Sequence, residues 1–281
     1  MTAENNVSTL VRSFYSEHPF PWFPADKFNL KEDLIRLSSD YAKMIYMNMP
    51  YGKSVLDLGC GTGQFSCFLS LKASRVLGID FSDASIARAN GLKQKLGLKN
   101  ITFENRDILK DLGKIQEKFD YIFCNGVLHH LDKPKEGFLN LSRLLKPGSF
   151  IIVGIYNKFG RISFRMQRKR KAQSIGRYLH KGYFEGKELN WELDQYCHPH
   201  EVSFSFGDIM DWFNEHNIRY CSSAPSIEHF NSHRLNTRPF SPAPRRFKFH
   251  GRIKNFLVQL SWMWSLSDSG GYSVIIGRKE S

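Results

Sequence analysis

The sequence predicts an α/β fold in which short buried strands alternate with helices. The first unit consists of an apolar run at 55–58, a glycine-rich loop at 59–63 and a helix-compatible run at 65–71. Four later apolar runs predict further strands, at 76–79, 101–103, 119–124 and 150–155. Alternation of this kind is typical of an open, doubly wound sheet whose strands are mostly parallel.

The glycine-rich loop indicates a ligand site. Gly59, Gly61 and Gly63 allow a tight turn that a ligand can approach closely, and the helix that follows presents its N–H groups there. A dinucleotide-binding fingerprint requires its third glycine at position 64, which is Gln64. An acid, Asp57, instead precedes the first glycine by two residues. Its carboxylate favours a ligand with an ammonium group and would repel a pyrophosphate.

A second acid, Asp80, follows the next apolar run, where a carboxylate can accept hydrogen bonds from two ribose hydroxyls. With the glycine loop, it resembles the motifs of class I S-adenosylmethionine (SAM) dependent methyltransferases, over roughly residues 51–156. The resemblance implies SAM as cofactor and a doubly wound, seven-stranded Rossmann-like sheet with the strand order 3-2-1-4-5-7-6. It implies that Asp57 binds the amino end of SAM, Asp80 the ribose and Asp107 the adenine amino group. The residues that it places at the cofactor are Asp57, Gly59, Cys60, Gly61, Gly63, Asp80, Phe81, Asp107, Ile108 and Asn125.

Two adjacent histidines, His129 and His130, follow the fourth predicted strand. In methyltransferases of the kind that this chain resembles, this stretch borders the methyl donor and the substrate. A histidine there can accept a proton from a substrate hydroxyl, thiol or amine near neutral pH, so we interpret the pair as candidate catalytic residues. The alternative is that one of them only orients the loop or packs under the next helix.

Aromatic residues and three prolines alternate at 12–24. The prolines predict an ordered, extended segment and exclude a long helix. Its aromatic side chains either close over a ligand as a lid or pack on the core, and Tyr15 and Trp22 are candidates for substrate contacts. Residues 30–49 predict one amphipathic helix before the first strand.

The second half of the chain adds segments to this core. We expect helices at 139–145, 205–216 and 253–266, a helix-capable basic stretch from 161 to 181, strands at 218–221 and 272–277, and a turn at 146–148. The predicted division is a lid and helix at 1–50, a SAM-binding core at 51–156, a cap insertion at 157–200, a core helix and strand at 201–225, a second cap insertion at 226–270 and a closing strand at 271–281.

These additions are expected to gather over one mouth. The fifth and sixth strands both run toward the carboxyl edge of the sheet, where ligands bind in open α/β folds. Tyr156, Tyr196 and His198 are therefore further candidates for substrate contacts. Cys197, His198 and His200 do not predict a metal site, since a proline restrains the two histidines and methyl transfer from SAM needs no metal.

The net charge of +13 is unevenly distributed. Residues 1–157 hold 20 Lys and Arg against 16 Asp and Glu, a net charge of +4, whereas residues 158–281 hold 20 against 11, a net charge of +9. The excess therefore lies mostly in the cap insertions. It fits an anionic small substrate, nucleic acid, an acidic membrane surface or a basic face that is simply solvated.

Three functions remain open at this point. The first is methyl transfer to a small-molecule acceptor under the basic, aromatic cap, the second is modification of RNA or protein, and the third is SAM binding without methyl transfer. Against RNA, Asn125-Gly126-Val127-Leu128 stands where an Asn/Asp-Pro-Pro-Tyr/Phe motif would follow the fourth strand. No apolar run is long enough to span a membrane, the N-terminus lacks the pattern of a secretory signal, and the five cysteines form no C-x-x-C pair. A cytoplasmic location is therefore expected.

Overall fold

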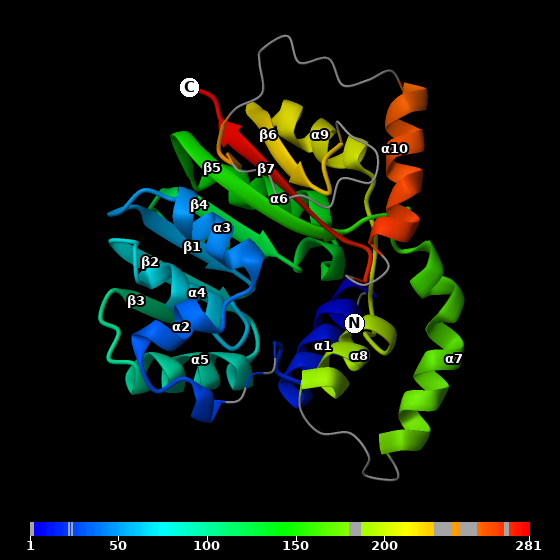
Figure 1. Cartoon of the computed structure of the whole chain (residues 1–281), viewed down its shortest axis with the longest axis horizontal. Helices are drawn as coiled ribbons and strands as arrows, with labels where there is room; N and C mark the ends of the chain where they lie inside the picture. The colour runs from blue at the N-terminus through cyan, green and yellow to red at the C-terminus, as the bar shows by residue number, and fades with distance from the viewer. Residues whose placement is uncertain are drawn as a thin grey trace.

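A seven-stranded mixed sheet with helices on both faces organises the chain (Figure 1). The computed structural model describes residues 3–21, 23, 25–179, 187–227, 238–241, 252–266 and 270–281. The strands are β1 (Ser54–Leu58), β2 (Arg75–Asp80), β3 (Ile101–Asn105), β4 (Phe119–Asn125), β5 (Leu145–Tyr156), β6 (Ile218–Ala224) and β7 (Tyr272–Lys279). Their order is β3-β2-β1-β4-β5-β7-β6, and β7 is antiparallel to both of its neighbours. The predicted fold class and strand order are confirmed.

Two apolar layers bury the faces of this sheet. On one face lie α2 (Lys31–Arg36), α3 (Asp40–Asn48), α4 (Gln64–Ser70) and α5 (Asp83–Lys95). On the other lie α6 (Pro134–Arg143), α9 (Phe206–Glu215) and α10 (Arg252–Ser265). Trp262 of α10 is completely buried in this second layer, so it packs on the core. None of the described helices is long and apolar enough to cross a membrane.

Local signals fix the ends of several of these helices. The Ser82 side chain caps α5 by accepting a hydrogen bond from the Ser85 amide, and Gly97 follows the helix with a φ of +61°.

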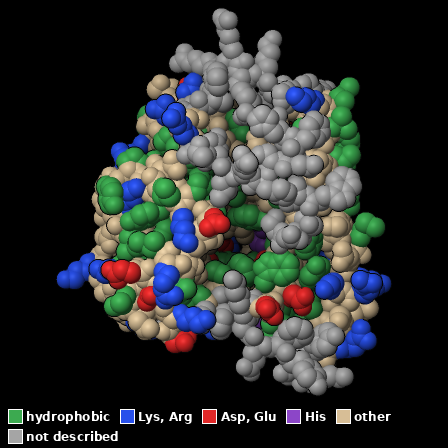
Figure 2. All heavy atoms as spheres, in the orientation of Figure 1, with side chains coloured by type: hydrophobic (Ala, Val, Ile, Leu, Met, Phe, Trp, Pro, Cys, Tyr) green, Lys and Arg blue, Asp and Glu red, His purple; other side chains and the backbone are tan. Residues whose placement is uncertain are grey.

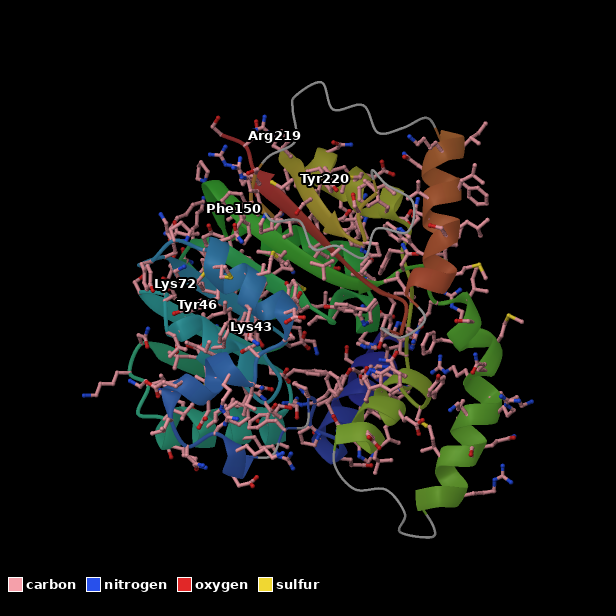
Figure 3. The ribbon with its side chains drawn as sticks, in the orientation of Figure 1. Lys43, Tyr46, Lys72, Phe150, Arg219 and Tyr220 are labelled. Atoms are coloured by element: carbon pink, nitrogen blue, oxygen red, sulfur yellow. The ribbon has the colours of Figure 1, made fainter. Side chains whose placement is uncertain are left out.

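Between α4 and β2, the Lys72 ammonium group lies 5.0 Å from the centre of the Tyr46 ring and donates to the Tyr46 carbonyl (Figure 3). These two contacts hold α3 against the loop between α4 and β2.

Two predictions for the N-terminal region are wrong. Residues 12–17 are not extended but complete α1 (Ala3–Glu17), because the first proline stands at position 19, beyond the helix end. The predicted helix at 30–49 is divided into α2 and α3. Ser39 separates them, since its extended backbone and its side chain, which accepts from the Ala42 amide, begin a new helix there.

The predicted helix at 139–145 and the turn after it also need correction. The helix is α6, which begins at Pro134 because proline is well tolerated in the first turn of a helix. The strand β5 already begins at Leu145 and includes the predicted turn at 146–148. There the pairing with β4 jumps from Phe119–Leu145 to Tyr121–Phe150, so the turn signal marks an irregularity within the strand.

A third layer covers the carboxyl edge of the parallel strands. It contains α1, α7 (Ile162–Leu179) and α8 (Lys187–Tyr196), and Figure 1 shows α1 and α8 side by side near that edge. Phe164, Ile175, Leu193 and Tyr196 form a small apolar cluster of their own within it. We call α7 and α8 the cap. Most of the predicted loop at 226–250 lies outside the described residues.

Candidate functional site

The glycine loop after β1 lies between the end of β2 and the N-terminal segment. Gly59, Gly61 and Gly63 have φ angles of +68°, +53° and +80°, which only glycine adopts without strain. The Gly61 amide donates to the Asp80 carboxylate at 2.9 Å. A Cβ at Gly61 would lie 2.0 Å from the Phe20 carbonyl oxygen. The absence of a side chain therefore allows the loop to contact the N-terminal segment directly.

Two carboxylates, the buried Asp57 and the partly buried Asp80, line the cavity beside this loop. Burial and, to a smaller extent, the neighbouring Asp80 raise the pKa of Asp57 to about 7, although a hydrogen bond from Ser66 opposes them. Burial also raises the pKa of Asp80, although amide N–H groups of Ser82, Gly61 and Phe81 counteract the shift. No Lys or Arg among the described residues forms an ion pair with either carboxylate. The pair is therefore suited to a ligand that brings hydrogen-bond donors and positive charge.

The residues predicted to lie near the adenine also line this cavity. Phe81, Asp107 and Ile108 line it, and Asp107 holds the loop by accepting from the Leu109 amide at 2.9 Å. Asn125 also lines the cavity, at the end of β4. Gly63 does not, because its Cα faces Ala89 and the Phe103 ring under α4. Nine of the ten predicted cofactor residues thus meet at one cavity of about 610 Å³.

Both predicted histidines reach this cavity, and their hydrogen bonds distinguish them. They belong to a short 3-10 helix, Leu128–His130, after β4. The His129 Nδ1 accepts from the Tyr156 amide at 3.2 Å, so its proton lies on Nε2. The His130 Nδ1 lies 3.0 Å from the His200 carbonyl oxygen, to which it can only donate, so Nε2 keeps its lone pair. Burial lowers the pKa of both rings.

A carboxylate from the cap, Asp194, completes this end of the cavity. The Tyr15 hydroxyl of α1 donates to it at 2.8 Å and the Tyr156 hydroxyl of β5 at 3.0 Å. Asp194 is 5% exposed. Asp194 was not predicted from the sequence, although Trp191, Asp194 and Gln195 have the spacing of one helix face and all three line the cavity. The aromatic wall residues Tyr41, Phe65 and Tyr272 were not predicted either, whereas Phe20 belongs to the aromatic segment that was expected to close over a ligand or pack on the core.

Comparison with known proteins identifies the family. A family model described as a methyltransferase domain matches residues 51–194, which is just over half of the chain. The chain belongs to this methyltransferase family. An uncharacterized protein from Synechococcus is 25% identical over 244 residues, covering 74% of this chain and 58% of that protein. The ubiquinone biosynthesis O-methyltransferase of Coxiella burnetii is 34% identical over 109 residues, covering 38% and 45% of the two chains. The methyltransferase chain spans about half the length of these curated relatives.

Solved structures share the fold of this methyltransferase. The magnesium protoporphyrin IX methyltransferase of Synechocystis, with bound S-adenosylhomocysteine (SAH), has a TM-score of 0.54 at 15% identity and covers 98% of this chain and 100% of its own. A structure concerned with the conversion of a disulfide bond into a thioacetal group during echinomycin biosynthesis has a TM-score of 0.55 at 19% identity, covering 98% and 93%. SAM is the cofactor of this class. The glycine loop and the unpaired carboxylates fit its amino acid and ribose groups.

We expect SAH to bind this methyltransferase more tightly as the pH rises toward 7. The ligand's ammonium group favours ionised Asp57, whose pKa of about 7 leaves the carboxyl mostly protonated at lower pH. Affinity should therefore rise by up to about tenfold per pH unit below 7 and then level off. Calorimetric titrations between pH 5 and 8 measure this, with Asp57→Asn expected to give a flat profile. A wild-type profile as flat as that of the variant would contradict the assignment.

Without ligand, the same group affects the free energy of unfolding in the opposite direction. The pKa of Asp57 is raised above its ordinary value near 3.8, so the folded protein binds the proton more tightly. Its contribution to stability is present at low pH and is lost as the pH rises from about 4 to 7.

Replacement of Asp80 by alanine should weaken SAH binding about tenfold or more. Charge-assisted hydrogen bonds of the kind expected from ribose hydroxyls contribute about 1.5–3 kcal/mol. The variant also removes the acceptor of the Gly61 amide. Asp83→Ala is the matched control, since that carboxylate lies three residues away and its side chain is 81% exposed. Equal SAH affinity in Asp80→Ala and wild type, with the fold intact, would exclude the role of Asp80.

The remaining candidates for substrate contacts differ in where they lie relative to the cavity. Tyr15 and Tyr156 line the cavity. His198 is buried behind it, where its ring lies 3.7 Å from that of His130. Tyr196 does not line it and instead stacks on Phe164 inside the cap. Trp22 lies outside the described residues.

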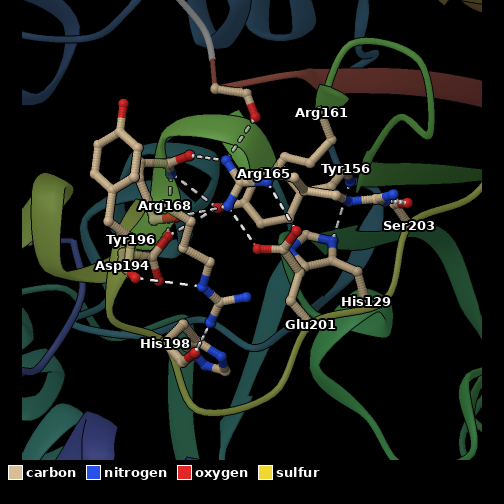
Figure 4. Close-up of polar contacts among 12 residues, drawn as sticks. His129, Tyr156, Arg161, Arg165, Arg168, Asp194, Tyr196, His198, Glu201 and Ser203 are labelled. Carbon is tan, nitrogen blue, oxygen red and sulfur yellow. Dashed lines mark hydrogen bonds and ion pairs between the residues drawn. The ribbon is translucent and has the colours of Figure 1, made fainter. Parts of the chain in front are cut away.

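Three arginines, Arg161 just before α7 and Arg165 and Arg168 within it, donate to the segment that follows α8. Arg161 is buried and donates through two nitrogens to Glu201 (Figure 4). Arg165 donates to Ser203, and Arg168 to the backbone carbonyl of His198. Within the described part of the chain, the cavity wall contains no Lys or Arg, and no cluster of three metal-binding side chains occurs. Figure 2 shows a hollow near the middle of this face, with histidine side chains at depth.

Proposed function

We propose that this methyltransferase transfers a methyl group from SAM to a small-molecule acceptor held inside the cavity. The observation that carries the proposal is that nine of the ten predicted cofactor residues and His130 line one cavity. Its walls include Tyr15 from α1 and Trp191 from α8, so both the lid and the cap contribute. The volume of about 610 Å³ is within the range of small-molecule sites. The O-methyltransferase name of the Coxiella relative supports an acceptor of this size.

The residues at the acceptor end have distinct tasks in this proposal. SAM supplies an electrophilic methyl group, which the acceptor atom takes in line as the carbon–sulfur bond breaks and the sulfur keeps the electron pair. His130 accepts the acceptor's proton at Nε2, because Nδ1–H is bound to the His200 carbonyl. Tyr15, Tyr156 and the aromatic wall orient the acceptor, which raises the rate by holding the reacting atoms close together.

The N-terminal segment acts as both lid and packing in this proposal. Tyr15 lines the cavity, whereas Phe23 packs on Phe28 in the apolar layer. Thr62 of the glycine loop holds the segment, with its amide donating to the Phe20 carbonyl and its hydroxyl to the Pro21 carbonyl. Acceptor entry therefore requires motion of a segment that is bonded to the cofactor loop.

A transfer experiment tests the proposed function. The purified protein is incubated with SAM labelled in its methyl group and, separately, with the low-molecular-weight, RNA and protein fractions of a bacterial extract. We expect labelled product in the small-molecule fraction, and markedly less of it at subsaturating SAM when Asp80→Ala replaces the wild type. Label that enters the RNA or protein fraction alone would reject a small-molecule acceptor. SAH binding without any transfer would favour a SAM-binding protein that does not methylate.

A polymer acceptor is the alternative, and the exposed cations of α7 favour it. Lys169, Arg170 and Arg177 are exposed, in contrast to Arg161. If they bound RNA, affinity would fall steeply as salt rises, because each phosphate contact releases counterions. The test is RNA binding at low and physiological salt, with these three residues replaced together by glutamine. Tight binding that persists at physiological salt in the wild type alone would make RNA the better acceptor.

A further inference from the structure

Asp194 is a buried carboxylate without a cationic partner. It is 5% exposed, and the described part of the chain places no Lys or Arg within ion-pair distance of it. Its oxygens accept only from neutral donors, the hydroxyls of Tyr15 and Tyr156 and the amide of Gln195. Burial of an ionised carboxylate is costly unless a positive charge compensates it. The site therefore lacks a positive charge that a ligand can supply.

The nearby cation does not fill this role, because it is already paired. Arg161 approaches the cluster from behind and lies 3.9 Å from the centre of the Tyr156 ring. Its Nε and Nη2 donate to the two carboxylate oxygens of Glu201, and both side chains are almost completely buried. Its Nη1 donates to Gln195, which in turn donates to Asp194 (Figure 4). The charge of Arg161 is thus balanced by Glu201.

The surroundings of Asp194 suit a cation rather than an anion. Trp191, Tyr15 and Phe20 contribute aromatic surface to the cavity, and aromatic faces attract ammonium groups. Of the other carboxylates of the wall, Asp57 and Asp80 lie beside the glycine loop, and Asp107 lies in the loop after β3. Asp194 alone comes from the cap, among the described carboxylates of this wall. Asp194 is therefore placed to select which acceptor binds at the cap side of the cavity.

We propose that Asp194 binds a positively charged amino group of the acceptor, so that the enzyme acts on amine-bearing small molecules. The inference rests on the proposed function and specifies its substrate class. It replaces the anionic substrate that the charge of the chain suggested. The proposal concerns the group that Asp194 holds, whichever atom of the acceptor receives the methyl group.

Matched pairs of ligands test this inference. Phenethylamine is compared with phenethyl alcohol, and cyclohexylmethylamine with cyclohexylmethanol, by calorimetry on the SAH-saturated protein. Each pair differs in the ammonium group alone. We expect at least one amine to bind about 30-fold or more tightly than its alcohol, as is typical when a buried charge gains its partner. The preference should disappear in Asp194→Asn. Equal binding of amine and alcohol, or binding of no probe, would overturn the proposal.

Two controls separate the possible causes of a change. Asp211→Asn removes an exposed carboxylate of α9 with the same change in net charge, and should retain the full amine preference. SAH binding is measured first in every protein. If SAH does not bind wild type, the proposed function fails, whereas loss of the amine preference alone rejects only this inference.

A third measurement excludes a role for Asp194 toward the sulfonium of SAM. The ratio of SAM to SAH affinity is compared between wild type and Asp194→Asn. An unchanged ratio supports binding of the acceptor amine. A ratio that falls by the same factor as the amine preference would assign the carboxylate to the cofactor and overturn the proposal.

Discussion

Replacement of His130 by alanine is expected to slow methyl transfer by about 10²–10⁴-fold, the usual contribution of a positioned general base. The hydrogen bond from Nδ1 to the His200 carbonyl fixes the tautomer, and the Nε2 lone pair is the proton acceptor that remains. Burial lowers the pKa of His130, so the ring is neutral and ready to accept a proton at neutral pH. Single-turnover rates measure the effect, while SAH affinity should change by less than about twofold since His130 serves the acceptor.

The pH profile and chemical rescue distinguish a base from a structural residue. Because the pKa is lowered, the wild-type rate should stay level as the pH falls through 6.5 and decline only below it. Added imidazole should restore part of the rate of His130→Ala. A variant that retains the wild-type rate would refute the role, and a slow variant with no rescue and a shifted SAH affinity would indicate a structural one.

The cofactor half of the site could be predicted from sequence because its signals are local. Gly59 and Gly61 mark the loop in the sequence because their positive φ angles strain any residue that has a Cβ. Asp80 is the last residue of β2 and Asp57 the last but one of β1, so their place near the carboxyl edge follows from the strands themselves. Strands that are buried on both faces appear as continuous apolar runs, which is why the strand starts, except that of β5, were recovered closely.

The acceptor half depends on contacts between distant segments, which leave no local pattern. Tyr15 and Asp194 are 179 residues apart in the chain, yet their side chains share a hydrogen bond. The backbone bond to His200 that distinguishes His130 from His129 likewise spans 70 residues. Sequence could place both histidines at the site but could not indicate their tautomers, because tautomers depend on tertiary partners.

The net charge of the cap does not describe the charge of the cavity wall. A net charge counts every Lys and Arg equally, whatever each side chain contacts. In the structure Arg161 is buried against Glu201, and Arg168 bonds the backbone near His198. Among the described residues, the charged side chain that the cap contributes to the cavity wall is the Asp194 carboxylate. The net charge of residues 158–281 does not reveal this.

Gly61→Ala is expected to weaken SAH binding about 100-fold, which corresponds to roughly 2.8 kcal/mol. The substitution places a Cβ 2.0 Å from the Phe20 carbonyl oxygen, and neither atom can move away by a side-chain rotation, because the backbone fixes both positions. The loop and the N-terminal segment must separate, which disrupts the two hydrogen bonds from Thr62 to Phe20 and Pro21. A left-handed φ of +53° adds about 1 kcal/mol of strain for alanine. Calorimetry with SAH and thermal unfolding measure the two consequences.

Gly91→Ala is the control for this substitution, because it adds the same methyl group where nothing lies within 4 Å. Gly91 is exposed in the interior of α5, so alanine should stabilise the helix by about 0.5–1 kcal/mol and leave SAH affinity unchanged. The contrast separates the effect of contact from that of helix propensity. If Gly61→Ala bound SAH as tightly as Gly91→Ala, the close approach of Phe20 to the glycine loop would not be required for cofactor binding. The N-terminal segment would then act at the acceptor end alone, through Tyr15.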